Sequence, residues 1–567
     1  MDKKNYKRLR EGEYKSIARD LFESMKGKLA MDQTNTIVLA TILLDLQKNN
    51  IEIEKNTYLE KSMYSDEVKN IIERYIDIVW EIVVEKLDKY SEDELLSLII
   101  NYENDMEIYT PIGISNLAQN ILDIKDNETV LNICSGTGNF EMESILHNKA
   151  KYKGIEINYS NNEVSTLRKE ILDIDAEFIR EDALKFEYDK KYDKIFSNYP
   201  FNISIINMNE IKTNISEKFN ISNEILKRVS SEWLYNVIII ESIKESGKAV
   251  VIMSNGNTWN NRYKDIRKYF IENKYIETVI SLPERIFNGT NIGTTMMVFS
   301  KNNKKIRFVD ARNICEIGRV KNSITESDVD KIINLINNDN ELSIEVGYDE
   351  ISDDEYTLNA IKYIEKVPEF ENGVEFKSII KGIRRGLQIK ADDLDNMKSK
   401  VMTKDKYVTL SNIEDGMIEF KEEQYLSEIP ENMYKYCINN EEMIISKIGN
   451  NNFKSTVIEN LAEDEKLLST GNMFIIEFDK QKVNPLYIQA LFSSNLGEEI
   501  FKGVYTGTVI STISVEKLKK MIIPLPDKDE QDIIANKYMA NLDEIIMLKR
   551  KLERVKERIK STFEECE

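Results

Sequence analysis

The sequence predicts an α/β protein with a helical N-terminal domain, a Rossmann-like domain, a smaller α+β domain and a long C-terminal helix. Apolar residues recur near the helical period before residue 105. Short apolar strands then alternate with glycine turns and helical stretches. A heptad repeat occupies the end of the chain. Over 567 residues, these patterns favour a chain of several domains.

The expected domain boundaries follow from changes in these patterns. We place the domains at residues 1–105, 106–365, 366–529 and 530–567. The polar stretch around Pro368 is the predicted linker, because proline interrupts the apolar periodicity there. Beyond it, short alternating runs such as residues 406–410 and 443–449 predict a small β-rich domain.

Within residues 129–140 of the Rossmann-like domain, a short apolar strand runs into a Gly-x-Gly turn. Gly136 and Gly138 let the backbone pass close to a ligand. The turn lacks the third glycine of the dinucleotide fingerprint and the Gly-Lys-Ser/Thr of a phosphate loop. Glu156 ends the next strand, where an acid suits a ribose diol, and Asp182 follows a third strand, where it can accept from an adenine amino group.

An Asn-Tyr-Pro-Phe corner ends the next apolar run. The Asn198 amide oxygen and the Tyr199 carbonyl can both accept hydrogen bonds from an NH2 group. Pro200 fixes φ and turns the chain, and Phe201 offers a ring on which a flipped base can stack. Alone, such a corner is as readily an ordinary turn. After the glycine turn and the two acids, it predicts methyl transfer to an exocyclic amine.

In this order the motifs resemble those of the adenine-N6 DNA methyltransferases, in particular the modification subunits of type I restriction systems. The resemblance covers most of residues 105–365. It implies catalysis at Asn198, Tyr199, Pro200 and Phe201, with S-adenosylmethionine as the methyl donor. It implies that the cofactor is bound by Tyr109, Thr110, Pro111, Asn132, Ser135, Gly136, Gly138, Glu156, Asp182 and Ala183. Within this set, residues 109–111 resemble the segment that touches the methionine end.

The chain departs from the family pattern at two places. Asn132 and Ile133 stand where the family has Asp-Pro, and Tyr199 stands where it has proline. The second motif residue contributes a backbone carbonyl, which Tyr199 retains. Ribosomal-RNA adenine dimethylases also lack proline there, so an RNA adenine methyltransferase remains an alternative. A catalytically inactive DNA-binding subunit is the second alternative.

Residues 371–567 resemble a target-recognition domain of type I specificity subunits. The resemblance is carried by the run at 506–514, by Pro524-Leu525-Pro526 and by Glu530-Gln531 before the long helix. Specificity subunits usually carry two such domains, whereas this chain has one. The resemblance implies double-stranded DNA as the substrate. No nuclease or helicase motif is present in the sequence, so cleavage would need a separate restriction subunit, or the enzyme acts alone.

The final helix carries a heptad seam. The seam residues are Tyr538, Ile545, Leu548, Leu552, Val555 and Ile559. In specificity subunits such a helix pairs with a second one. Here it either packs on its own chain or pairs two chains in a homodimer, which would place two recognition domains on a palindromic site.

Composition limits the partners and the location. A formal net charge of −21 is unusual for a DNA-binding protein, but phosphate contacts need only a local basic stripe. Lys381, Arg384 and Arg385 are the predicted DNA contacts. The four cysteines and the single histidine, His147, lack the spacing of metal ligands, so no metal is expected. The first residues lack a signal segment and no run approaches a membrane span, so we expect a cytoplasmic protein.

Overall fold

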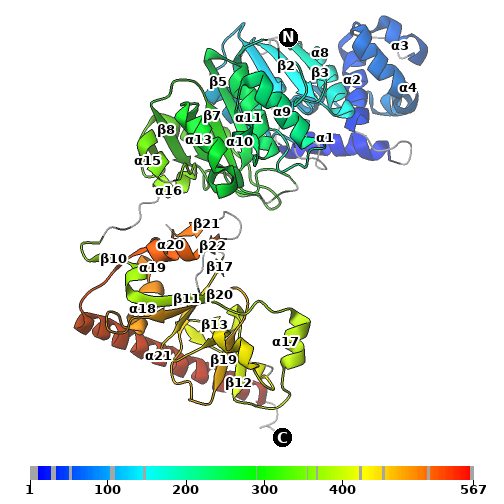
Figure 1. Ribbon diagram of the computed structural model, residues 1–567. Helices are drawn as coiled ribbons and strands as arrows, with labels where there is room; N and C mark the ends of the chain where they lie inside the picture. The colour runs from blue at the N-terminus through cyan, green and yellow to red at the C-terminus, as the bar shows by residue number, and fades with distance from the viewer. Residues whose placement is uncertain are drawn as a thin grey trace. The chain divides into compact units, whose positions relative to one another are not determined.

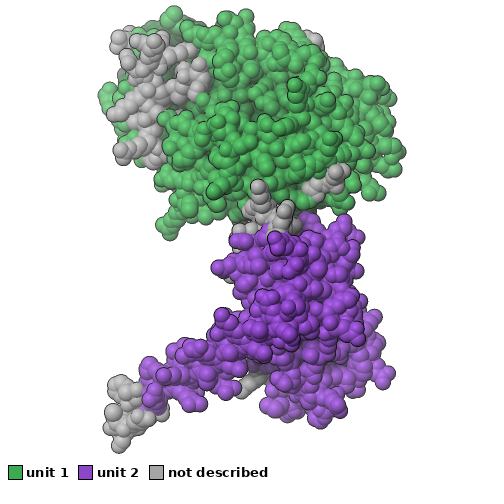
Figure 2. Space-filling model, turned by 90° about the vertical axis from the view of Figure 1, so that its left-hand side faces the viewer, with its two compact units in different colours: residues 1–364 green, residues 365–567 purple. Residues whose placement is uncertain are grey.

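The computed structural model describes the chain except at residues 1–10, 27–32, 50–53, 103–108, 145–147, 189, 289, 291, 354, 365–367, 369, 421–423, 450–453, 503, 507–510 and 562–567. The predictions on the first residues, on His147 and on part of the 506–514 run lie outside the described residues. The chain forms two compact units, residues 1–364 (unit 1) and 365–567 (unit 2) (Figure 2). The unit boundary falls beside the predicted linker; the division into four domains stays a prediction.

Helices form the N-terminal part of unit 1, drawn in blue in Figure 1. They are α1 (Glu11–Ser24), α2 (Gln33–Asn49), α3 (Lys55–Lys61), α4 (Asp66–Lys86) and α5 (Glu92–Ile100). Local capping defines their starts: the Ser65 hydroxyl accepts from the Val68 N–H, and Ser91 and Glu94 form a capping box. Their apolar faces share one hydrophobic core with Leu167 and Phe178 of the α/β part.

A nine-stranded sheet forms the centre of unit 1, in the order β3-β2-β1-β4-β5-β7-β6-β8-β9. Its strands are β1 (Thr129–Ile133), β2 (Lys151–Glu156), β3 (Ala176–Arg180), β4 (Tyr192–Ser197), β5 (Ile243–Ser254), β6 (Ile276–Ser281), β7 (Thr294–Phe299), β8 (Lys305–Asp310) and β9 (Ser343–Gly347). Strands β1 to β5 are parallel, and β7 runs antiparallel between β5 and β6. Because the strand order reverses between β1 and β4, a crevice is expected outside their carboxyl ends.

Helices cover both faces of this sheet (Figure 1). One face packs on α6 (Ile112–Leu122), α7 (Asn139–Glu143) and α14 (Glu326–Asn337). The other face packs on α9 (Met208–Phe219), α10 (Asn223–Leu226), α11 (Ser231–Ser242), α13 (Lys264–Glu272), α15 (Tyr348–Asp353) and α16 (Ala360–Ile364). Helix α8 (Tyr159–Ile171) joins β2 to β3, and the short α12 (Gly256–Trp259) follows β5. Alternate residues of β5 serve the two cores: Val250 and Ile252 one, Val251 and Met253 the other.

A buried arginine joins the helical part to the sheet. The Arg168 side chain on α8 is fully buried. Its guanidinium donates to the carbonyls of Ile99 and Ile100 at the end of α5, at 2.8 and 2.7 Å. It also donates to the Thr137 carbonyl and to Asn139 Oδ1, each at 2.7 Å. The carbonyl end of a helix is partly negative, so this position stabilises a buried cation.

Unit 2 is α+β, with several small sheets and a long terminal helix. Its strands are β10 (Gly373–Glu375), β11 (Ile380–Arg385), β12 (Asp405–Val408), β13 (Ile413–Glu414), β14 (Met417–Ile418), β15 (Cys437–Ile438), β16 (Met443–Ser446), β17 (Ile448–Gly449), β18 (Ser455–Val457), β19 (Lys466–Ser469), β20 (Met473–Phe478), β21 (Tyr505–Thr506), β22 (Ser511–Ile513) and β23 (Ile522–Pro524). Its helices are α17 (Ala391–Met397), α18 (Pro485–Phe492), α19 (Asn495–Lys502), α20 (Val515–Lys520) and α21 (Lys528–Ser561). The first strand, β10, pairs antiparallel with the last, β23.

The start of α21 explains the short motif that precedes it. The Asp527 carboxylate accepts from the Glu530 N–H at 2.9 Å, which caps the helix. The buried Gln531 side chain donates to the Pro526 carbonyl at 2.8 Å and accepts from the Asn484 N–H at 2.8 Å. The helix entry is therefore held to the body of unit 2.

The predicted fold class is confirmed: the chain is α/β, with a helical N-terminus, an α+β part and a long C-terminal helix. None of the helices in the described ranges combines the length and the apolar composition of a membrane span.

We expect Arg168→Leu to lower the free energy of unfolding of unit 1 by about 3 kcal/mol or more. The change removes the Arg168 donor from the buried Ile99 and Ile100 carbonyls at the end of α5, and each unsatisfied acceptor costs about 1–3 kcal/mol. All three tryptophans, Trp80, Trp233 and Trp259, lie in unit 1, so urea unfolding followed by tryptophan fluorescence measures this unit. The matched control is Arg228→Leu at an exposed position, which should change stability little.

Candidate active site

The glycine turn lies at the carboxyl edge of the sheet. The Ser135 N–H donates to the Ile155 carbonyl at 3.0 Å, and the Gly136 N–H donates to Glu156 Oε2 at 2.8 Å. Gly136 and Gly138 adopt φ of 57° and 81°, which favours glycine. No atom lies within 4 Å of where a Cβ would stand at Gly136. The turn is thus fixed by hydrogen bonds to β2. Its backbone is open at Gly136, where a ligand would contact it.

The two predicted acids lie beyond neighbouring strands. Glu156 ends β2, and its second oxygen accepts from the Asn158 N–H at 2.7 Å. Asp182 follows β3, with Oδ1 accepting from the Leu184 N–H at 3.0 Å. Ala183, which lies between Asp182 and Leu184 in the same turn, is buried. Both carboxylates are therefore held in place by backbone donors on the edge that carries the glycine turn.

Thr110 connects three predicted parts of the site. The Asn198 Nδ2 donates to Thr110 Oγ1 at 3.1 Å, although 88 residues separate them in the chain. The Asn139 Nδ2 donates to the Thr110 carbonyl at 3.1 Å. Beside it, Pro111 forms the N-cap position of α6, and the Tyr109 hydroxyl contacts the Lys321 ammonium. Residues 109–111 are thus joined to the glycine turn and to the Asn-Tyr-Pro-Phe corner. No sequence motif pointed to Lys321.

The Asn-Tyr-Pro-Phe corner is held by its side chains. The Ser197 hydroxyl, just before it, donates to the Ile133 carbonyl at 2.6 Å. The Tyr199 side chain is buried: its hydroxyl donates to Asn236 Oδ1 at 2.8 Å, and its ring stacks on Tyr235 with centroids 5.1 Å apart. The tyrosine at the second position therefore anchors the corner in the core. Only the backbone of Tyr199 remains to contact a substrate.

The other two corner residues lie nearer the surface. Pro200 is exposed. The half-buried Phe201 meets Phe287 edge to face, with ring centroids 5.6 Å apart. Phe201 is therefore held in orientation by one aromatic neighbour.

Glu232 supports the corner from behind, a role that the sequence did not reveal. Its carboxylate on α11 accepts from the Asn202 N–H at 3.2 Å, just after the corner. It also accepts from the Ser254 N–H at 2.7 Å and from the Ser254 hydroxyl at 2.9 Å, at the end of β5. Burial raises the pKa of Glu232, and these donors lower it. The contact fixes the turn after Phe201 to the sheet.

Four side-chain oxygens at this edge are buried and lack a hydrogen-bond partner in the part of the chain that the structure describes. They are Asn132 Oδ1, Ser135 Oγ, Glu141 Oε1 and Asn198 Oδ1. A buried acceptor without a donor costs about 1–3 kcal/mol, so such atoms are few in folded proteins. Their grouping beside the open glycine turn indicates a site for a polar ligand that supplies donors.

The predicted DNA contacts on β11 differ from one another. Arg384 donates to both oxygens of the buried Glu442 carboxylate, at 2.7 and 2.6 Å, and to the Cys437 carbonyl at 2.6 Å. Arg384 therefore forms an ion pair inside unit 2 and stabilises this unit. Lys381 is exposed, 3.7 Å from Glu477, and Arg385 is exposed. A DNA contact by Lys381 and Arg385 stays a prediction.

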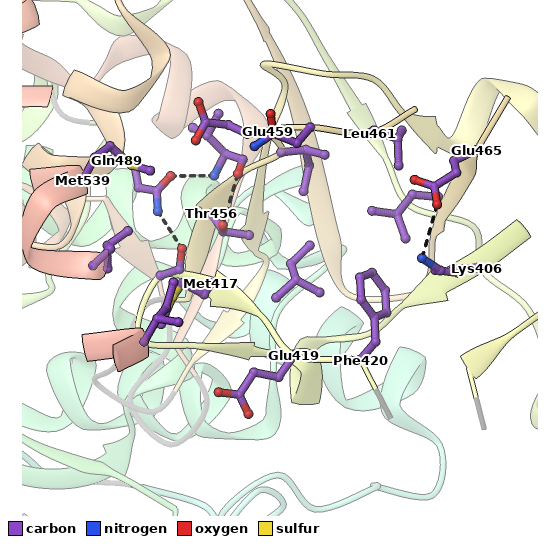
Figure 3. A pocket seen from close by; sticks show the side chains of 18 of the residues that line it. Lys406, Met417, Glu419, Phe420, Thr456, Glu459, Leu461, Glu465, Gln489 and Met539 are labelled. Atoms are coloured by element: carbon purple, nitrogen blue, oxygen red, sulfur yellow. Dashed lines mark hydrogen bonds and ion pairs between the residues drawn. The ribbon is translucent and has the colours of Figure 1, made fainter. Parts of the chain in front are cut away.

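A pocket of about 620 Å³ lies in unit 2 between the β13–β14 hairpin, β18, β19 and α21 (Figure 3). Its walls include Met417, Phe420 and Leu461, and α21 contributes Met539. The Gln489 side chain crosses one end, accepting from the Val457 N–H at 2.7 Å and donating to the Gly416 carbonyl at 2.6 Å. The pocket is largely apolar, with cations and acids around its rim.

The second half of α21 buries none of its described side chains fully, and Lys549 ties it to Asp415 and Glu419 of the β13–β14 hairpin region. The fully buried residues of this helix are Gln531, Ala535 and Leu542, all in its first half. The seam residues Leu548, Leu552 and Ile559 are 58%, 54% and 68% exposed. The later part of the predicted seam therefore forms an exposed apolar stripe, whereas Tyr538 at its start is bonded to Gln489 and Ser493 within unit 2.

Comparison with known proteins identifies part of the chain. Residues 95–372 match the family model of the N-6 DNA methylases. The chain is similar to the type I restriction enzyme MjaVII methylase subunit of Methanocaldococcus jannaschii, with 25% identity over 337 residues, 53% of this chain and 58% of that protein. It is also similar to a protein of the same organism named putative type I restriction enzyme MjaX specificity subunit, with 28% identity over 185 residues, 32% of this chain and 42% of that protein.

One solved structure that resembles the chain is a type I restriction-modification methyltransferase subunit from Streptococcus thermophilus. It is 19% identical and covers 62% of this chain and 84% of that chain, with a TM-score of 0.43. The chain spans about half the length of the curated methylase subunits that it matches. Residues 95–372 therefore match the N-6 DNA methylases, and the chain is similar to the methylase subunits of type I restriction enzymes.

Proposed function

We propose that this protein transfers a methyl group from S-adenosylmethionine to the N6 amine of a flipped adenine in specific duplex DNA. The observation that carries this proposal is the hydrogen bonding of the Asn198 side chain. Its Nδ2 donates to Thr110, so its orientation is fixed, and its Oδ1 is buried without a donor. An exocyclic amine is a donor that fits this oxygen.

The site has the features that S-adenosylmethionine requires. The open backbone at Gly136 and the unpartnered Asn132 and Ser135 oxygens provide room and acceptors. In this proposal residues 109–111 contact the methionine end, Glu156 the ribose, and Asp182 with Ala183 the adenine, beside the turn of Gly136 and Gly138. When bound, the cofactor supplies the electrophilic methyl group of its sulfonium.

The protein's own part in the reaction is to position the amine. The adenine N6 is a poor nucleophile because its lone pair is delocalised into the ring. Hydrogen bonds from its two N–H groups to Asn198 Oδ1 and the Tyr199 carbonyl favour a more tetrahedral nitrogen with a localised lone pair. Phe201 stacks on the flipped base, whose extrusion costs a few kcal/mol. Alignment of the reacting groups can supply much of the rate.

Duplex DNA is proposed as the substrate because of unit 2. The similarity to a specificity subunit and the motif before α21 support a target-recognition role for this unit. Lys381 and Arg385 are the proposed phosphate contacts, since both are exposed on β11. Cleavage of DNA, if the protein serves restriction, is assigned to a separate subunit.

We further propose that two copies pair through α21. The stripe of Leu548, Leu552, Val555 and Ile559 has the alternating three- and four-residue spacing of a coiled coil. A second α21 that packs against this stripe removes its exposed apolar side chains from water. The apolar pocket beside Met539 and Leu542 lies on the same helix, and it offers further surface to a partner helix. A two-fold pair presents two recognition units to a palindromic site.

Replacing Asn198 with alanine should reduce methylation by at least about 100-fold, because a positioned hydrogen-bonding group is lost at the reacting atom. The measurement is sequencing of N6-methyladenine in DNA from cells that express the chain alone. The matched control is Asn209→Ala, an exposed helical residue nearby, which should leave the modified motif intact.

Calorimetry of S-adenosylmethionine binding separates the possible results of this experiment. Retained binding in Asn198→Ala together with a lost DNA motif supports the catalytic assignment. A motif that persists in the variant contradicts it. If the native chain modifies RNA and leaves DNA unmodified, the RNA alternative replaces the proposal; if it binds cofactor and modifies neither, the protein is a binding subunit.

Leu552→Lys should convert a dimer to a monomer, because it places a charge within the apolar seam. Light scattering coupled to gel filtration measures the mass of each variant. Met547→Lys is the matched control, since this exposed residue lies off the seam by roughly 100° around the helix. A native protein that is monomeric at every concentration tested would remove the dimer from the proposal.

A further inference from the structure

A buried acid lies beside the first residue of the glycine turn. Asn132, near the end of β1, and Glu141, in the first turn of α7, are both almost fully buried. The Asn132 Nδ2 donates to Glu141 Oε2 at 3.0 Å. Among the residues that the structure describes, Asn132 Oδ1 and Glu141 Oε1 remain as two buried acceptors without a donor. The pair can therefore accept hydrogen bonds from a ligand that brings at least two N–H groups.

The protein does not neutralise this acid by a direct ion pair. Arg168, whose charge acts on Glu141, directs its guanidinium to the Thr137 and Ile100 carbonyls and to Asn139. Burial raises the pKa of Glu141 to about 7, and the Asn132 bond and the Arg168 charge lower it. A buried carboxyl without a partner is costly, and a cationic ligand would offset that cost.

The position of the pair points to one end of the proposed cofactor. Between Asn132 and Glu141 in the chain, Asn139 donates to the Thr110 carbonyl, in the segment proposed to contact the methionine end. That end of S-adenosylmethionine carries an α-ammonium, a cation with three N–H donors. Position 132 is a neutral amide where the resembling family has a carboxylate, and Glu141 supplies a negative charge next to it.

We propose that Glu141 and Asn132 together bind the α-ammonium of S-adenosylmethionine, with the Glu141 carboxylate providing the charge and Asn132 Oδ1 a second acceptor. This assignment rests on the proposed use of S-adenosylmethionine. It makes Glu141 a cofactor-selecting residue, since ligands without the amino-acid end gain nothing from it. It also accounts for an acid at a fully buried position of α7.

The test compares two ligands by calorimetry on the full chain. S-adenosylmethionine carries the α-ammonium, whereas 5′-methylthioadenosine has the same nucleoside and lacks the amino-acid end. Glu141→Gln keeps an acceptor for Asn132 and removes the charge. We expect it to weaken S-adenosylmethionine binding by about 10- to 100-fold, the range for a lost charged hydrogen bond, and to change 5′-methylthioadenosine binding less than about twofold.

Three further variants sharpen this test. Asn132→Asp with Glu141→Gln returns the charge to the other member of the pair, and should restore most of the affinity for S-adenosylmethionine. Glu143→Gln, a buried acid two residues along the same helix, is the matched control and should alter neither ligand. Asn132→Ala removes the second acceptor and leaves Glu141 in place. It should weaken the binding of S-adenosylmethionine and leave the binding of 5′-methylthioadenosine unchanged. Tryptophan fluorescence shows whether Glu141→Gln folds. If it does not fold, the Asn132→Ala variant provides the test of the assignment.

The outcomes separate this inference from the proposed function. Equal weakening of both ligands in Glu141→Gln, or no weakening of either, overturns the assignment while S-adenosylmethionine binding by the native chain still stands. A native chain that binds neither ligand overturns the proposed function itself, and the assignment with it. Selective loss of S-adenosylmethionine, restored in the double variant, supports the assignment.

Discussion

The buried guanidinium of Arg168 is the interaction on which the rest of unit 1 depends. Its donors reach the last carbonyls of α5, the backbone of the glycine turn and the Asn139 side chain. Asn139 holds the Thr110 carbonyl, and the Thr110 hydroxyl accepts from Asn198. A continuous series of hydrogen bonds therefore runs from the N-terminal helices to the amide proposed to hold the reacting amine. A buried cation must be fully solvated by the protein, so the helices and the sheet have to assemble around it together.

Much of the fold and part of the site could be predicted from the sequence, because local motifs encode local backbone geometry. Gly136 and Gly138 adopt the positive φ that their residue type permits, and the acids at 156 and 182 follow their strands as expected. The heptad seam was also visible, since periodicity is a property of the chain alone. The proposed roles of these residues remain predictions that the geometry accommodates.

What the sequence did not reveal is pairing across long separations. Glu232, Arg168 and Glu141 look like ordinary charged residues of amphipathic helices, and only the packing of those helices shows that all three are buried. The sequence also did not reveal the ion pair of Arg384, which belongs to a visible basic run. Its partner Glu442 is 58 residues away, and nothing local predicts that their strands bring them together. Charge patterns identify candidates, whereas burial and topology decide which of them face solvent.

The pairing of β10 with β23 has a consequence for how such proteins diversify. The strand that opens unit 2 and the strand that precedes α21 lie side by side, so the intervening polypeptide begins and ends at one place. A segment with adjacent ends can be exchanged as a single block by recombination at two nearby junctions, without disturbing the chain on either side. The segment proposed to recognise DNA can therefore be exchanged in one genetic event, while unit 1 and the terminal helix are inherited unchanged.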